Sequence, residues 1–195
     1  NYVPQVGDKV IAEDGIYVVQ GENLIPNHSF DEGLVNWTAG DGSAISADNF
    51  EVVAEGGPDG GAYLKALGGA GSGSNKSIKQ GWQLTPGKTY LFSMWANRTA
   101  SGMSSNTQYS KICAAASATG TDEQLTLVSY KADTWVQTQV VFTATAERPY
   151  CVANFGWLNG ATSLDCCFLG EVQLSNELNV AKLEQLIADA EALLA

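Results

Sequence analysis

The residues in this sequence best suited to chemistry are aromatic rings and side-chain amides that share faces of expected strands. Successive strand residues point to opposite faces, so Trp95 shares a face with Ser93, and Gln137 shares one with Gln139. Amides make poor core but pair well with hydroxyl groups, and an indole ring packs against the apolar face of a sugar. The pattern predicts a surface for a neutral, hydroxyl-rich ligand, formed by Trp82, Trp95, Asn97, Tyr109, Gln137, Gln139 and Trp157.

An ordinary solvated face explains each of these positions almost as well, so the prediction depends on the whole set. Large aromatic residues are often buried in a core, and we expect this of Trp37 and Trp135. Trp95 is expected on the face opposite Tyr90, Phe92 and Met94, because those three form the more apolar side of their strand.

Nucleophilic catalysis with a histidine base would have to use His28, the one histidine of the chain. It lies in a segment that reads as a surface loop, and no carboxylate pair forms a recognisable glycosidase signature. We therefore expect a protein that binds without catalysing a reaction. An enzyme whose site is completed by further sequence stays open as an alternative.

The four cysteines, Cys113, Cys151, Cys166 and Cys167, allow three pairings, and the sequence does not choose among them. One disulfide between Cys113 or Cys151 and the adjacent pair would suit an exported protein. Buried free thiols are the equal alternative. Zinc is not indicated, because the ligand spacing of zinc sites is absent.

The net charge of the chain limits the classes of partner that it can bind. Ten basic residues stand against 21 acidic ones among 195 residues, a net charge of −11, which argues against nucleic acid as a partner. No apolar run approaches the ~20 residues of a membrane span.

The acidic residues gather in residues 1–60, which suits either a calcium site or a solvated acidic surface. The chain begins without Met or a signal peptide, so we expect a processed or excised piece.

The chain divides into three segments that differ in composition and in the spacing of their apolar residues. Residues 1–22 carry two β-branched runs around Asp14-Gly15 and predict a β-hairpin that must dock on something. Residues 23–174 alternate short apolar strands with Gly, Asn, Asp and Ser clusters, which predicts an all-β sandwich of two antiparallel sheets. Residues 175–195 have apolar residues at helical spacing and predict a helix that starts a linker or a following domain.

Four phrases in residues 23–174 resemble calcium-bearing jelly-roll carbohydrate-binding modules, such as those of families four, sixteen and twenty-two. They are NLIPNHSFDEG at 23–33, LTPGKTYLFSMWA at 84–96, WVQTQVVFTA at 135–144 and FLGEVQL at 168–174. The hairpin and the trailing helix are similar to modules of gut and rumen Bacteroidetes proteins. The resemblance implies a jelly-roll β-sandwich with a structural calcium ion.

The resemblance also implies the metal ligands, with one departure. Where the family's closing strand carries an aspartate, this sequence has Gly170, followed by Glu171. Asp31 stands where the family places an acidic ligand after Phe. We therefore expect calcium, if it is bound, at Asp31 and Glu171, where it would join the first strand of the module to the last.

The function implied by the resemblance is non-catalytic binding of a plant cell-wall polysaccharide: β-glucan, xylan, mannan or a pectic glycan. The module would be secreted, periplasmic or at the cell surface, and covalently linked to a glycoside hydrolase or polysaccharide lyase. The alternative is a scaffold or protein-interaction sandwich of a large surface protein, without glycan affinity.

Overall fold

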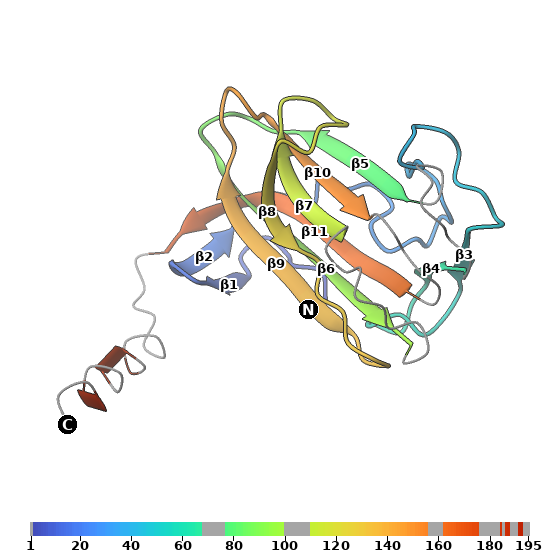
Figure 1. Cartoon of the computed structure of the whole chain (residues 1–195). Coiled ribbons are helices and arrows are strands. Elements are labelled where there is room, and N and C mark those ends of the chain that lie inside the picture. The colour runs from blue at the N-terminus through green and yellow to red at the C-terminus, as the bar shows by residue number, and fades with distance from the viewer. Residues whose placement is uncertain are drawn as a thin grey trace.

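The structure, a computed structural model, describes residues 2–67, 77–99, 110–155 and 162–175, together with 184, 186, 187, 191 and 192. It contains eleven strands in this part of the chain (Figure 1). Their bounds are β1 Lys9–Ala12, β2 Gly15–Val19, β3 Phe50–Val53, β4 Tyr63–Ala66, β5 Ile78–Gln83, β6 Thr89–Arg98, β7 Ser110–Ala115, β8 Glu123–Leu127, β9 Val136–Thr143, β10 Tyr150–Phe155 and β11 Thr162–Leu174.

The strands form two antiparallel sheets, as the sequence predicts. The four-stranded sheet has the order β5-β10-β7-β8. In the seven-stranded sheet, the long strand β11 pairs with β6 along one edge, and β6 pairs with β9. Along its other edge, β11 pairs first with β4 and later with β2, so the hairpin β1–β2 extends the same sheet.

The main core lies between the two sheets and follows the strand alternation. Tyr90, Phe92 and Met94 of β6 are buried there, together with Phe142 of β9 and Cys151 of β10. The prediction that the apolar side of β6 faces the core is confirmed. Trp95 consequently lies on the outer face of the seven-stranded sheet.

A second apolar cluster covers part of that outer face. Tyr17 and Val19 of β2 pack against Leu91, Phe168 and Val172 of the sheet, and all five are buried. The predicted hairpin therefore docks on its own module. Its turn is one residue earlier than expected, at Glu13-Asp14, because Ala12 pairs with Gly15.

Strand β11 is interrupted by a bulge between Asp165 and Phe168, where its register with β6 shifts. Cys166 sits in this bulge with a φ of 50°, a left-handed conformation that few residues adopt outside turns and bulges. The alternation of side chains consequently restarts within the strand: Leu164 and Cys167 both face the core.

All four cysteines are buried free thiols, so the disulfide alternative is not realised. Burial raises the pKa of each of the four thiols. The helix expected over 175–195 falls mostly outside the described residues. Among the residues that are described, none forms a helix with the length and apolarity needed to cross a bilayer.

Candidate functional site

The outer face of the seven-stranded sheet carries the predicted aromatic and amide residues. Trp95 on β6 is the cross-strand neighbour of Gln137 on β9 and of Asp165 on β11. Asn97 and Gln139 continue the same face along their own strands, at the alternate positions that point outward. The structure thus brings together four predicted residues, with Gln137 and Gln139 exposed and Trp95 and Asn97 half-buried.

This face is not bare, because the N-terminal segment lies across it (Figure 1). The indole N–H of Trp95 donates a hydrogen bond of 3.0 Å to the carbonyl oxygen of Tyr2. The Tyr2 ring stands edge-on to the Trp95 ring, with centroids 4.9 Å apart and an interplanar angle of 69°. The Gln139 amide donates a 2.7 Å bond to the carbonyl oxygen of Ile11 on β1.

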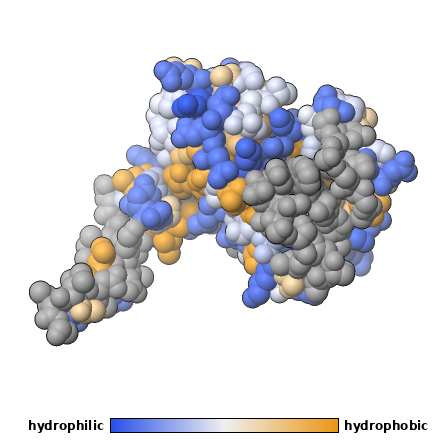
Figure 2. All heavy atoms as spheres, viewed as in Figure 1, coloured by the Kyte–Doolittle hydropathy of each residue, from blue (hydrophilic) through white to orange (hydrophobic). Residues whose placement is uncertain are grey.

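Two grooves flank the contact between Gln139 and Ile11. One, of about 520 Å³, opens beside Gln137 and is bounded by Pro4, Asp8 and the outer edge of β1. The other, of about 810 Å³, lies between the hairpin turn at Glu13-Asp14, strand β8 and strand β9. Figure 2 shows apolar side chains gathered on this side of the molecule, between the hairpin and the centre. The grooves therefore combine amides, carboxylates and aliphatic surface.

Trp135 lies at the other end of this face. It was expected in the core, but it is half-buried and packs against Tyr63 of β4, with ring centroids 5.5 Å apart. Its indole N–H donates to the carbonyl oxygen of Gly56 in the β3–β4 loop, at 3.3 Å. Its outward position was already visible in the alternation of β9, because Trp135 precedes Gln137 by two residues.

Trp82 does not join the predicted surface. It lies on the side of β5 that faces the seven-stranded sheet and packs against Trp37 and Phe92, with ring centroids 5.9 Å and 6.5 Å away. Since Trp95 points out of the opposite side of the seven-stranded sheet, the two indoles cannot contact one ligand. Tyr109 and Trp157 lie outside the described residues.

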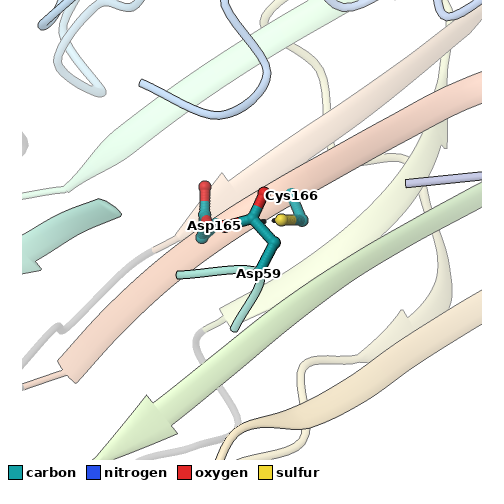
Figure 3. Close-up of side chains that lie close together, drawn as sticks. All are labelled: Asp59, Asp165 and Cys166. Carbon is teal, nitrogen blue, oxygen red and sulfur yellow. Dashed lines mark hydrogen bonds between the residues drawn. The ribbon is translucent and has the colours of Figure 1, made fainter. Parts of the chain in front are cut away.

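A cluster of possible metal ligands lies under the β3–β4 loop. Asp59 from that loop meets Asp165 and Cys166 of the β11 bulge, and their ligand atoms all lie within 4.8 Å of one another (Figure 3). Asp165 is fully buried, and its Oδ1 atom has no hydrogen-bond partner among the described residues. The Cys166 thiol donates to Asp165 Oδ2 at 3.2 Å. Burial is the main cause that raises the pKa of Asp165 to about 7.

The entry segment adds two groups near this cluster. The charges of Asp31 and Asp59 act on both Asp165 and His28. Half-burial lowers the pKa of His28, and its Nδ1 atom has no partner within the described part of the chain. A buried carboxylate oxygen and a buried imidazole nitrogen without partners are costly, and a cation held by the nearby carboxylates would compensate the first.

The expected metal pair, Asp31 with Glu171, is not formed. Glu171 Oε2 accepts a hydrogen bond from Lys88 Nζ at 2.6 Å. Glu171 also lies beyond the bulge from Asp165: their partners on β6, Tyr90 and Trp95, are five residues apart, about 17 Å along an extended strand. The charge of Asp31, in contrast, acts on Asp165 and raises its pKa. The oxygen ligands that the fold brings together are those of Asp59 and Asp165, with Asp31 nearby.

Comparisons with known proteins bear on this site. A family model described as a carbohydrate binding domain matches residues 22–152. No curated protein matches the sequence. Two solved structures from Paenibacillus barcinonensis are similar. The first is the CBM22-1 xylan-binding domain of a Paenibacillus barcinonensis protein. It is 15% identical with a TM-score of 0.51, and the match covers 89% of this chain and all of that domain. The second is the CBM22-1-CBM22-2 tandem domain of the same organism. It is 16% identical with a TM-score of 0.52, and the match covers 83% of this chain and 49% of the tandem.

The enzymatically active domain of a tailspike protein from bacteriophage CBA120 is also similar. It is 13% identical with a TM-score of 0.52, over 76% of this chain and 21% of that one. At these identities the likeness concerns the fold, and it confirms the predicted jelly-roll β-sandwich.

Proposed function

Because the chain belongs to the carbohydrate binding domain family, we propose that it binds plant cell-wall polysaccharide without cleaving it, on the outer face of the seven-stranded sheet. The observation that carries the proposal is the cross-strand pair of Trp95 and Gln137, next to an open groove. An aromatic ring beside an amide offers a sugar both a stacking surface and a hydroxyl partner.

The grooves favour an uncharged polymer within that class. Glu13 and Asp14 line the larger groove, so a uronic-acid chain would meet carboxylates of its own sign there. In the smaller groove Asp8 is accompanied by Lys9, and the lining charges of the two groups cancel. Xylan is the first polymer to test, since a similar domain is named xylan-binding. An affinity in the micromolar to millimolar range, about −4 to −8 kcal/mol, is expected for such a shallow, partly polar site.

A catalytic role is not favoured by the carboxylates that do lie together. Asp165 and Asp59 are close, and the raised pKa of Asp165 would suit a general acid. However, Asp165 is fully buried beneath Gly57 of the loop, which leaves no space for a substrate at its carboxyl group.

Asp59 and Asp165 instead fit a structural calcium ion, with Asp31 as a possible third oxygen donor. Calcium is a hard cation that takes carboxylate oxygens, and it would supply the missing partner of Asp165 Oδ1. The Cys166 thiol acts as a hydrogen-bond donor to Asp165, so it is protonated rather than a thiolate ligand. Bound there, calcium would fasten the β3–β4 loop to β11.

We place the domain outside the cytoplasm, linked to a glycoside hydrolase or polysaccharide lyase that it holds near its substrate, which raises the effective concentration. A scaffold or protein-interaction role is the second candidate. One observation favours it: the N-terminal segment already covers Trp95 and bonds Gln139.

Affinity gel electrophoresis against soluble xylan, β-glucan, mannan and polygalacturonate tests the proposal. Retardation by a neutral polymer, weakened in Trp95→Ala and Gln137→Ala, is the expected result. Gln83→Ala is the matched control, because Gln83 is an exposed strand glutamine on the other sheet. Absence of retardation by every polymer, for every variant, would favour the scaffold role.

A further inference from the structure

The N-terminal arm, residues Tyr2–Pro4, makes the contacts with Trp95 that a sugar would make. The indole N–H is the one hydrogen-bond donor of the Trp95 side chain, and it already donates to the Tyr2 carbonyl oxygen. The Tyr2 ring packs against the Trp95 ring in a T-shaped arrangement. Tyr2 thus engages both groups that Trp95 would offer to a sugar: the indole N–H, which could donate to a hydroxyl, and the aromatic ring.

The arm is held less firmly than the hairpin that follows it. Val19 of β2 is 1% exposed and pairs with Val172 of β11, so the hairpin is built into the sheet. Tyr2, in contrast, is 42% exposed, and Val3 is half-buried at the margin of the second apolar cluster. Pro4 is buried and marks the end of the arm.

A turn separates the arm from the hairpin, and its backbone N–H groups bond within residues 5–8 and to β2, while the Gln5 side-chain amide donates to the Val3 carbonyl oxygen at 3.3 Å. The backbone N–H of Asp8 donates to the carbonyl oxygen of Gln5, and the Asp8 carboxylate accepts from the Gln5 N–H, both at 2.9 Å. Gly7 adopts a φ of 91° and donates to the Val19 carbonyl oxygen at 2.9 Å. The arm can therefore leave Trp95 by a change at residues 2–4, while the turn and the hairpin keep the hydrogen bonds of their backbone N–H groups.

We propose that the N-terminal arm is an intramolecular occupant of the carbohydrate-binding face, which a polysaccharide must displace from Trp95. The inference rests on the proposed function and adds its regulation. Gln139 keeps its bond to Ile11 when the arm leaves, so the ligand contacts Trp95 and Gln137. The apparent affinity is reduced by the fraction of molecules in which the arm is bound, so weakening the arm strengthens glycan binding.

The test compares Tyr2→Ala, and a variant that lacks residues 1–3, with the wild-type chain. Affinity electrophoresis on neutral polymers measures binding, and acrylamide quenching of Trp95 fluorescence measures exposure. The chain has five tryptophans, so the Trp95 signal is taken as the difference between each protein and its Trp95→Phe counterpart. Val6→Ala is the matched control, since Val6 is 59% exposed in the turn after the arm.

Both arm variants are expected to bind the same polymer about two- to ten-fold more tightly, the worth of one aromatic pair. Trp95 is expected to be quenched more readily in them, and Val6→Ala to match the wild-type chain in both measurements. If the wild-type chain binds a polymer and the arm variants bind it equally or more weakly, the arm is a wall of the site and the inference is overturned. If no polymer retards any variant, although quenching shows Trp95 uncovered, the proposed function itself fails.

Discussion

Gly57 lies directly against the carboxylate of Asp165. A Cβ atom on Gly57 would be 2.7 Å from Asp165 Oδ2, closer than Cβ atoms approach other atoms in proteins, and 3.0 Å from the Gly61 carbonyl oxygen, which is tighter than nine in ten such contacts. Only glycine lets the β3–β4 loop descend this far onto the β11 bulge. This contact buries Asp165, sets Asp59 beside it and thereby creates the candidate cation cluster.

Calcium is expected to stabilise the protein through this cluster. A cation present at about 100 times its dissociation constant adds about 2.7 kcal/mol to the free energy of unfolding, which corresponds to about 5–10 °C in Tm for a chain of this size. Thermal unfolding with calcium and with EDTA measures the difference. Asp165→Asn and Asp59→Asn should abolish the calcium-dependent increase.

Glu171→Gln separates this site from the one that the sequence suggests. Because Glu171 is paired with Lys88, this variant should keep the full calcium response. A response lost in Glu171→Gln and kept in Asp165→Asn would place the ion at the other end of β11.

Without calcium, Asp165 should make the protein less stable as the pH rises. Its pKa is about 7 in the folded chain and ~3.9 in an unfolded one, so the folded state holds the proton more tightly. The contribution of Asp165 to the free energy of unfolding is fully present below pH ~4. It is lost progressively between pH ~4 and pH ~7, by a few kcal/mol in total. Urea unfolding in EDTA between pH 4 and 8 should therefore show a steeper decline for the wild-type chain than for Asp165→Asn. Parallel curves for the two proteins would contradict this.

Trp82 and Trp95 should respond oppositely to replacement by alanine. Trp82 packs between the sheets against Trp37 and Phe92, so Trp82→Ala should lower the free energy of unfolding by about 3 kcal/mol. Trp95→Ala should cost clearly less stability but weaken polysaccharide retardation. Denaturant unfolding and affinity electrophoresis on both variants give the comparison, and it fails if Trp82→Ala spares stability while binding is lost.

The hairpin should contribute to the stability of the whole domain. Val19 is 1% exposed and packs with Leu91 and Phe168, so Val19→Ala should cost about 1.5–3 kcal/mol. The exposed Val6, changed to alanine, should stay within about 0.5 kcal/mol of the wild-type value. Chemical denaturation followed by far-ultraviolet circular dichroism measures both, and equal stabilities of the two variants would show that the hairpin is an independent appendage.

The sequence by itself determined the strands and the faces of β6 and β9. Strand alternation has a period of two and depends only on residues that are adjacent in sequence. It therefore predicted that Trp95 points outward and that the opposite face of β6 points inward, with Tyr90, Phe92 and Met94. The shared face of Gln137 and Gln139 follows for the same reason. Apolar residues on both sides of the Asp14 turn likewise predicted that the hairpin must dock.

Only the tertiary structure decided where distant segments meet. Alternation puts Trp82 on the strand face of Ile78 and Leu84, but only the packing of the two sheets puts that face and Trp95 on opposite sides of the seven-stranded sheet. The bulge at Cys166 shifts the register of β11, and it brings Asp165, rather than Glu171, to the loop that carries Asp59. The contact between Tyr2 and Trp95 joins residues 93 positions apart. Such pairings depend on the packing of the whole chain, which alternation within one strand does not encode.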